Sequence, residues 1–474
     1  MLDLAIGESA DVVLGDGARH AVKLVGLTEP RCKARGIIRF PVAHVEVDGE
    51  PVDLTAALYH MPTVLKGLRI GCAVTRGVSD ALASFRDVFA LEKDARIRVW
   101  DAAGPLFHET PIVYPARQAW FASMTQMANE KTHVDAGEAF LVNEKRHVYH
   151  HFGMDFGGYE YAVPVVAARS GQVVVRGEET VAGYDPETGG ALRYDRVVVR
   201  DDEDWYFLYS HLTMIDAGVR LGERVEAGEA IGLLGKEGSS GGWSHLHFGM
   251  RSVQPNGRYG EVEGYPFLVE AYLNEHPGSL LACARPHLVG LVGEPVTLEA
   301  GRSISDGSDI VSHRWKLHTG EEVEAMETTL SYEREGIYSE MLTVEDAHGQ
   351  TDVDFCVVQI VPQDGDPART PPGIHLAHFP TEGIRPGQPV AFKVRCFFKG
   401  PFAGNAGGED EWDFGDGTTA VSWSDSPARG AASTDTDYAE RWHAFEHPGR
   451  YIVTVRRTGA NGVSSTAQIK VDVG

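Results

Sequence analysis

Short apolar segments rich in valine and separated by glycine are the feature that most restricts the fold of this chain. The sequence contains 54 glycines among 474 residues. In residues 138–273, valine-rich segments recur at roughly 8–12-residue intervals, which is typical of all-β domains. Val197–Arg200 and Trp205–His211 are predicted to form a hairpin around the acidic turn Asp201–Asp204. We interpret that turn as a solvated loop, with calcium binding as the less favoured alternative. The pattern predicts a mainly β fold.

The length predicts several domains, because a domain usually holds about 100–200 residues. The N-terminal region combines strand candidates such as Arg96–Asp101 with a helix predicted over Ser79–Lys93, where apolar residues recur at helical spacing and Ser79 is a cap candidate. Its sequence shows no metal or nucleophile motif, so the role of this mixed, β-rich domain stays open. The four predicted domains are residues 1–137, 138–273, 280–362 and 373–474, with a polar, proline-rich linker over 363–372.

The two C-terminal regions share a weak internal repeat. Trp315 in the first parallels Trp412 in the second, and Gly336–Tyr338 parallels Gly449–Tyr451. A tryptophan near the middle of each region and a Gly-x-Tyr strand near its end predict two related β-sandwiches. We expect each tryptophan to anchor the core of its sandwich.

The acidic charge balance excludes several classes of partner. The 43 Lys and Arg residues against 68 Asp and Glu residues give a formal net charge of −25, which argues against nucleic acid and anionic membranes as partners. No apolar run reaches the roughly 18–20 residues of a membrane-spanning helix, so we expect no membrane span. No signal-peptide pattern is visible at the N-terminus. The five thinly spread cysteines favour isolated buried thiols, with a Cys283–Cys356 bridge left open.

Three short motifs in residues 138–273 indicate a metal site. They are His151-x-x-x-Asp155, Tyr209-Ser210-His211-Leu212 and His245-Leu246-His247. Residues two apart share one face of a strand, so His245 and His247 point the same way. Imidazole nitrogen and carboxylate oxygen are typical ligands of Zn²⁺, and a catalytic site uses three protein ligands and leaves one place for water. Five candidates for three places leave two residues over, and two spare histidines suit proton transfer and oxyanion stabilisation.

These motifs resemble those of the M23 family of zinc metallopeptidases, the lysostaphin-like endopeptidases. The family pattern is His-x-x-x-Asp, then Tyr-x-His-Leu, then His-x-His, and Gly222–Gly232 is similar to the glycine-rich segment that the family has between the last two. The match covers about residues 147–250, and it implies an antiparallel β peptidase domain with Zn²⁺ as cofactor. The implied zinc ligands are His151, Asp155 and His247, with His245 as the general base and His211 as the group that stabilises the oxyanion.

Two positions depart from the family pattern. Trp243-Ser244 stands where the family commonly has Gly-Pro, and Gly249 stands where it commonly has Glu. Neither change removes a ligand, but the tryptophan is expected to reshape the substrate groove. A further hypothesis is that the N-terminal domain occludes this groove, with a polar side chain such as Asn129 filling the open zinc position.

The C-terminal regions resemble PKD domains, which are immunoglobulin-like sandwiches common in secreted enzymes. Residues 412–417 match the WDFGDG signature of that family, whereas the first region is more diverged. Asp413 and Asp416 suit a tight turn through side chain-to-backbone hydrogen bonds. The resemblance implies a secreted or periplasmic protein, with a polysaccharide or protein ligand for these domains.

Together the resemblances imply a zinc-dependent endopeptidase with a peptide or peptidoglycan substrate, and bacterial cell-wall peptide crosslinks are the expected bonds. One alternative is that the same zinc groove acts on an extracellular polysaccharide or another protein, which analysis of the products distinguishes. A second alternative is a non-catalytic binding or scaffold protein, which absence of zinc from the purified protein would favour.

Overall fold

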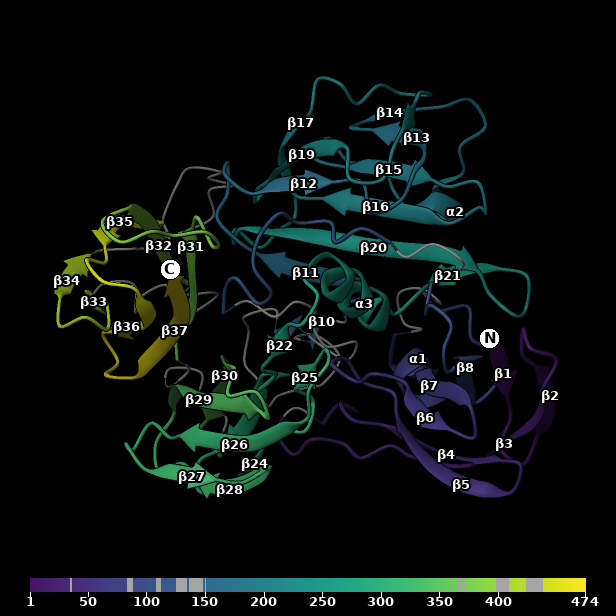
Figure 1. Cartoon of the computed structure of the whole chain (residues 1–474), viewed down its shortest axis with the longest axis horizontal. Coiled ribbons are helices and arrows are strands. Elements are labelled where there is room, and N and C mark those ends of the chain that lie inside the picture. Colours follow the sequence, from purple (N-terminus) through teal and green to yellow (C-terminus); the bar gives the residue numbers. More distant parts are fainter. Residues whose placement is uncertain are drawn as a thin grey trace.

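A computed structural model shows a protein built from several, mostly antiparallel, sheets (Figure 1). Strands make up 50% of the described residues and helices 5%, which confirms the predicted mainly β class. Four groups of strands follow one another along the chain: one N-terminal, one central and two C-terminal. The structure describes residues 1–34, 36–82, 88–107, 112–124, 134–135, 148–149, 151–364, 366, 369, 371–397, 409–422 and 438–474.

The N-terminal group has two four-stranded sheets that share one core. Its elements are β1 (Leu2–Leu4), β2 (Ser9–Val13), β3 (Arg19–Thr28), β4 (Val42–Val47), β5 (Glu50–Thr55), β6 (Thr63–Leu65), β7 (Leu68–Thr75), α1 (Arg76–Leu82) and β8 (Ala95–Asp101). The strand orders are β2-β3-β4-β5 and β1-β8-β7-β6. Leu24 and Val45 of one sheet are buried in the same cluster as Ile70 and Ile97 of the other.

The helix predicted over Ser79–Lys93 is only partly right. Helix α1 begins at Arg76, so Ser79 lies inside the helix and is not its cap. Residues 83–87 lie outside the described residues. Beyond them the Arg96 side chain donates hydrogen bonds of 2.6 and 3.0 Å to the carbonyls of Phe89 and Ala90. A buried arginine thus satisfies backbone groups that a continuing helix would have paired, which local periodicity does not reveal.

The central group holds the three motifs. Its elements are β9 (Val134–Asp135), β10 (Val148–Tyr149), β11 (Met154–Gly157), β12 (Pro164–Val166), β13 (Gly171–Arg176), β14 (Glu179–Thr180), α2 (Pro186–Gly189), β15 (Val197–Arg200), β16 (Tyr206–Ser210), β17 (Leu212–Ile215), β18 (Arg224–Val225), β19 (Ala230–Leu234), β20 (His245–Val253), β21 (Tyr259–Glu261) and α3 (Tyr265–Glu275). The main sheet has the order β11-β20-β16-β15-β13-β14, with β18 beside β13 and β21 beside β20. A smaller sheet has the order β12-β19-β17, and α3 packs its buried face into the same core.

The predicted hairpin is confirmed, because β15 and β16 pair in antiparallel register. The acidic turn between them is ion-paired. The Asp201 carboxylate accepts backbone hydrogen bonds from Glu203 and Trp205, both 2.9 Å. Arg224 forms two 3.0 Å bonds to the Asp202 carboxylate, and Arg200 pairs with Asp204. Residues 202–204 are exposed, as expected for a solvated loop, and nearby arginines balance their charges.

Two β-sandwiches follow, each with its own core. The first consists of β22 (Leu280–Leu281), β23 (Leu288–Leu291), β24 (Pro295–Glu299), β25 (Ile304–Ser305), β26 (Ile310–Lys316), β27 (Glu322–Glu324), β28 (Glu327–Ser331), β29 (Gly336–Asp346) and β30 (Thr351–Val361). The second, which we call the C-terminal sandwich, consists of β31 (Gly373–Phe379), β32 (Pro389–Phe397), β33 (Asp410–Asp413), β34 (Thr419–Ser422), β35 (Ala439–Ala444), β36 (Gly449–Thr458) and β37 (Ser464–Val473). Trp315 and Trp412 are buried in the respective cores, as the repeat predicts.

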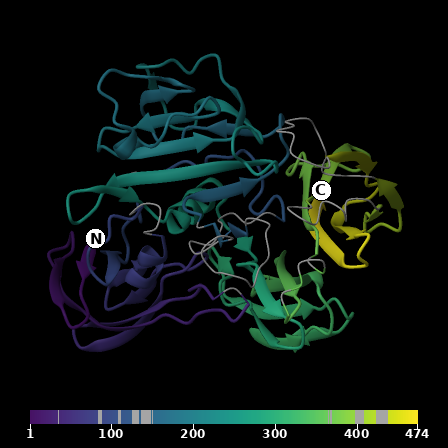
Figure 2. The ribbon, with the colours of Figure 1, turned by 180° about the vertical axis from the view of Figure 1, so that it is seen from behind.

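The two sandwiches share a sheet, and the second of them lies beside the central group (Figure 2). A parallel bridge between Ile337 of β29 and Ser465 of β37 links the two sandwiches into one nine-stranded sheet. On the other side, a bridge between Ser123 and Ala377 ties the segment before the central group to β31. The repeat predicts two similar units but carries no information about these links, because each depends on residues far apart in sequence.

The N-terminal group is fixed to the central group by a buried ion pair. Arg98 of β8 donates 2.6 and 2.7 Å hydrogen bonds to the backbone oxygen and carboxylate of Glu263, and both side chains are at most 5% exposed. No disulfide links any of the five cysteines; four are buried, as expected, and Cys32 is half-buried. Within the described part of the chain, no helix has the length and apolar character needed to cross a membrane.

Candidate metal centre

Adjacent strands bring the motif residues together. Strands β11 and β20 pair so that Asp155 lies opposite His247 and Gly157 lies opposite His245. On the other side of β20, Ser210 at the end of β16 also lies opposite His247, which places His211 directly beside the same strand. Pairing of β20 with both neighbours therefore gathers motifs that are about 100 residues apart in the chain.

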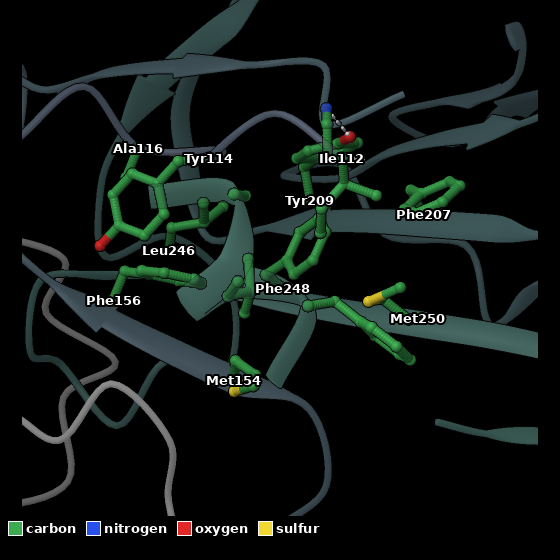
Figure 3. Close-up of a cluster of buried hydrophobic side chains, with 14 of the residues drawn as sticks. Ile112, Tyr114, Ala116, Met154, Phe156, Phe207, Tyr209, Leu246, Phe248 and Met250 are labelled. Carbon is green, nitrogen blue, oxygen red and sulfur yellow. Dashed lines mark hydrogen bonds between the residues drawn. The ribbon is translucent and has the colours of Figure 1, made fainter. Parts of the chain in front are cut away.

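The other face of β20 anchors the site to the core. Leu246, Phe248 and Met250 alternate with the site histidines and are at most 1% exposed. Figure 3 shows them with Phe156 of β11 and Tyr209 of β16 in one apolar cluster. The two-residue period of the strand thus puts the imidazoles on one face and fixes the backbone from the other, as the His-x-His spacing predicts.

Three ligand atoms converge on one point. The Nε2 atom of His151 lies 2.9 Å from Nδ1 of His247 and 3.3 Å from Oδ1 of Asp155, and the last two atoms are 3.0 Å apart. Ligands around a tetrahedral zinc, at about 2.0–2.2 Å from the ion, are separated by roughly 3.3 Å. The spacing and the chemistry of this donor set therefore fit Zn²⁺ with three protein ligands.

The groups around the Asp155 carboxylate favour the protonation states that bind a cation. Burial alone would raise the pKa of Asp155, but the surrounding imidazoles of His151, His245 and His247 outweigh it and hold that pKa well below its usual range. Burial lowers the pKa of His247 from 6.5 to about 4. At neutral pH the site thus offers an ionised carboxylate and an uncharged His247 ring, the protonation states that bind a metal.

Gly153 makes the turn that lets His151 and Asp155 face the same point. Its φ of +93° is a conformation that residues with a side chain rarely adopt. A Cβ atom at this position would lie 3.0 Å from the His247 ring and 3.0 Å from the Phe248 carbonyl oxygen. Both the backbone conformation and the close approach of the ring therefore require glycine here.

His245 is oriented by its own segment. Its Nδ1–H donates a 3.0 Å hydrogen bond to the Trp243 carbonyl, so the lone pair of the neutral ring is on Nε2, which lies 3.6 Å from Oδ2 of Asp155. The Trp243 ring stacks on the imidazole with centroids 4.1 Å apart. The tryptophan that departs from the family pattern thus covers one face of this histidine. Burial lowers the pKa of His245 to about 3.

His211 is held in a left-handed backbone conformation with φ +67°. Its Nδ1–H donates to the Glu237 carbonyl at 2.7 Å, and its ring centroid lies 4.6 Å from that of His245. Asp195 accepts a 2.8 Å hydrogen bond from the His211 backbone N–H and paired bonds from Arg193. Burial would raise the pKa of Asp195, but its bonds with His211 and Arg193 hold it well below the usual range.

The structure brings all five predicted site residues into one cluster. His151, Asp155 and His247 supply the converging atoms, and the rings of His211 and His245 lie beside them. The sequence analysis missed Asp195 and Arg193, because a carboxylate 16 residues from the histidine that it contacts has no recognisable spacing. Asn129, the residue suggested to fill the open zinc position, lies outside the described residues.

Two family models match parts of this chain. Residues 149–259 match peptidase family M23, and residues 284–360 match the PKD domain. The first match spans all three motifs. The second falls on the first sandwich, whose sequence is the more diverged of the two at the signature positions. No curated protein matches the chain.

Several solved structures are similar to parts of the chain. The catalytic domain of EnpA, a prophage-encoded M23 protein from Enterococcus faecalis, is 20% identical, with 33% of this chain and 93% of that chain covered and a TM-score of 0.19. Lysostaphin from Staphylococcus simulans is 19% identical over 46% of this chain and 85% of its own, with a TM-score of 0.21. The PKD1 domain of Vibrio anguillarum Epp is 25% identical over 17% and 93%, with a TM-score of 0.15.

Proposed function

We propose that this chain, which carries a family M23 peptidase domain and a PKD domain, is a zinc-dependent endopeptidase. The observation that carries the proposal is the convergence of ligand atoms from His151, Asp155 and His247, with the rings of His211 and His245 beside them. The first three residues are the proposed zinc ligands. The M23 match supports hydrolysis of a peptide bond over the other reactions that such a site performs.

His245 is the proposed general base. Zinc held by these ligands would act as a Lewis acid and would lower the pKa of water to about 7. The Nδ1–H of His245 is committed to the Trp243 carbonyl, so Nε2 accepts the proton of the attacking water. The Asp155 carboxylate, 3.6 Å from that nitrogen, supplies the opposite charge to the imidazolium that forms.

His211 is the proposed stabiliser of negative charge on the substrate oxygen. Its Nδ1–H is held by the Glu237 carbonyl, so Nε2 is the atom that faces substrate, and it donates a hydrogen bond when the ring is doubly protonated. Asp195, whose carboxylate is 3.2 Å from Nδ1, supplies the charge that balances such a ring. A cationic donor aimed at a developing oxyanion stabilises the transition state more than the ground state.

We further propose bacterial cell-wall peptide crosslinks as the substrate and a secreted or periplasmic location. Both rest on the resemblance to lysostaphin-like endopeptidases and on the PKD domain, whose proposed ligand is a polysaccharide or protein of the same surroundings. The net charge of −25 supports the expectation that neither nucleic acid nor an anionic membrane is a partner.

A digest of purified wall peptides and of a generic unfolded protein by the zinc-loaded chain tests this function. Mass spectrometry should find new amino termini at crosslinks of the wall peptides, and chelation should abolish them. His247→Ala should lose both zinc and activity, whereas His245→Ala should keep zinc and lose turnover. His313→Ala, which alters a histidine of the first sandwich, is the matched control and should behave as the unaltered protein.

The products also separate the alternatives. New reducing or unsaturated sugar ends without new amino termini would replace the peptidase proposal with a polysaccharide-cleaving enzyme. Full activity of His245→Ala would refute the role given to that residue. A purified protein that binds no zinc and cleaves neither substrate would point to a binding or scaffold protein.

A further inference from the structure

The C-terminal sandwich contacts the segment that leads into the site. In Figures 1 and 2 it lies beside the end of β20 at which that strand begins. Arg395 of β32 donates a hydrogen bond to the Gly242 carbonyl, and Tyr438, just before β35, bonds to Ser244. Ser244 directly precedes His245, so a sandwich some 200 residues away in the chain holds the backbone next to the proposed general base.

Of these two contacts, the one made by Tyr438 is nearer to His245 along the chain. Its hydroxyl oxygen accepts a 2.9 Å hydrogen bond from the Ser244 backbone N–H and lies 2.8 Å from Nδ1 of His375. Burial lowers the pKa of His375 well below its usual range, so the ring is neutral. The Tyr438 hydroxyl thus shares a hydrogen bond with Nδ1 of His375, and its oxygen also accepts the bond from the Ser244 N–H. The hydroxyl is held from both sides.

Ser244 is held from the opposite side as well. Its hydroxyl donates a 2.6 Å hydrogen bond to the carbonyl of Gly158, which follows β11, the strand that carries Asp155. Ser244 is 0% exposed. The same residue thus joins the Asp155 strand, the start of the His245 strand and the C-terminal sandwich, and it has little room to move while all three contacts persist.

Buried charges fix the sandwich at this position. Glu160 lies 3.5 Å from both Lys236 of the central group and Lys393 of the C-terminal sandwich. The Lys393 ammonium lies 4.5 Å from the centre of the Tyr438 ring and 4.7 Å from that of Tyr159. The side chains of all three charged residues are at most 9% exposed. Burial of charged groups is costly unless they are paired. These three buried residues therefore indicate a defined interface between the C-terminal sandwich and the central group, and not two domains joined only by a flexible linker.

We propose that the C-terminal sandwich is a structural part of the active site and that Tyr438 is a positioning residue. Its hydroxyl fixes Ser244 and thereby the backbone that delivers His245 to its place beside Asp155. The catalytic consequence rests on the proposed peptidase function. The positioning itself is a property of the folded chain, and it is measurable without substrate.

Tyr438→Phe tests the proposal in the full-length, zinc-loaded protein. The change removes one oxygen and keeps the ring over Lys393. Amide hydrogen exchange should become about tenfold or more faster at Ser244, because its N–H loses its partner. The zinc content should not change, kcat should fall about tenfold or more, and KM should stay within about twofold, since displacement of a reacting group slows the chemical step. Tyr451→Phe is the matched control, because it removes a hydroxyl that donates to the His447 carbonyl in the same sandwich.

Each outcome decides the proposal. Unchanged exchange at Ser244 in Tyr438→Phe overturns it, and so does faster exchange with full kcat. Equal losses in Tyr451→Phe would show general destabilisation of the sandwich and also overturn it. If the unaltered protein cleaves no peptide, the proposed function fails, and the exchange measurement alone then decides whether Tyr438 holds the segment.

Discussion

Replacing Lys393 by methionine should stabilise the protein at neutral and acidic pH. Lys393 shares the single carboxylate of Glu160 with Lys236, so the buried cluster holds two ammonium groups and one carboxylate. Glu440 lies opposite Lys393 on β35 and bonds the Tyr159 hydroxyl, and His375 faces the cluster from β31 as a neutral ring. Methionine replaces most of the apolar stem of the lysine without its charge and leaves Glu160 paired one-to-one with Lys236.

The magnitude follows from the cost of keeping Lys393 charged. Burial, only partly offset by Glu160, lowers the pKa of Lys393 from 10.5 to about 7. At about 1.4 kcal/mol per pH unit, that difference corresponds to at most ~5 kcal/mol. Local hydration of the interface reduces this figure, and replacement of buried ionic groups by apolar ones typically gains about 1–4 kcal/mol. We therefore expect Lys393→Met to raise the unfolding free energy by about 2–4 kcal/mol at pH 6.

The pH dependence gives this prediction its signature. The folded-state pKa of Lys393 lies below the unfolded-state value, so between about pH 7 and 10.5 the unfolded chain binds more protons and the unaltered protein gains stability as pH rises. Below about pH 7 the lysine is charged in both states and its full cost remains. The advantage of the variant should therefore be largest at pH 6 and shrink steadily above pH 7.

Scanning calorimetry of both proteins between pH 6 and 9.5 measures this effect. The transition that includes the C-terminal sandwich should shift upward in Lys393→Met by several degrees at pH 6 and by little at pH 9.5. Lys470→Met, which removes one of the ion-pair partners of Asp352, is the control and should give no gain at any pH. If Lys393→Met is less stable than the unaltered protein at pH 6, or if the difference in stability between the two does not depend on pH, the buried lysine charge does not destabilise the protein as argued.

Two further changes probe the site. Gly153→Ala places a methyl group 3.0 Å from the His247 ring at a positive φ, so zinc affinity should fall about tenfold or more in a competition titration with a chelator. Unchanged affinity would show that the turn is not needed. Asp195→Asn removes the negative charge beside His211, so kcat should fall about tenfold while the zinc content is retained. The pKa of Asp195 is held well below its usual range, so the difference in kcat between the unaltered protein and Asp195→Asn should persist as pH falls below 4. Loss of that difference near pH 5 would contradict the role given to Asp195.

The sequence predicted those features that depend on local pattern. The two-residue spacing of His245 and His247 determines which face of β20 they occupy, and valine-rich segments with turn residues between them determine the strands. The buried tryptophans of the two sandwiches follow from the repeat in the same way. Each of these properties is set by neighbours in the chain, so a single sequence suffices to find it.

Features that depend on contacts between residues far apart in the sequence could not be predicted from it. The sequence predicted helix as far as Lys93, but Arg96 bonds the carbonyls of Phe89 and Ala90, which do not lie in a helix. The support of His211 by Asp195 is a tertiary contact across the end of two strands. Tyr438 offers no motif at all, and only the docking of the C-terminal sandwich reveals its bond to Ser244.

The ligand set of bound zinc is the most direct test of the central claim. X-ray absorption at the zinc edge of the purified, zinc-loaded chain should show nitrogen and oxygen ligands at about 2.0–2.2 Å, with imidazole scattering from two histidines. That scattering should come from His151 and His247 and should fall by half in a sample of His151→Ala that still holds some metal. A sulfur shell near about 2.3 Å, or a spectrum that His151→Ala leaves unchanged, would contradict the proposed site.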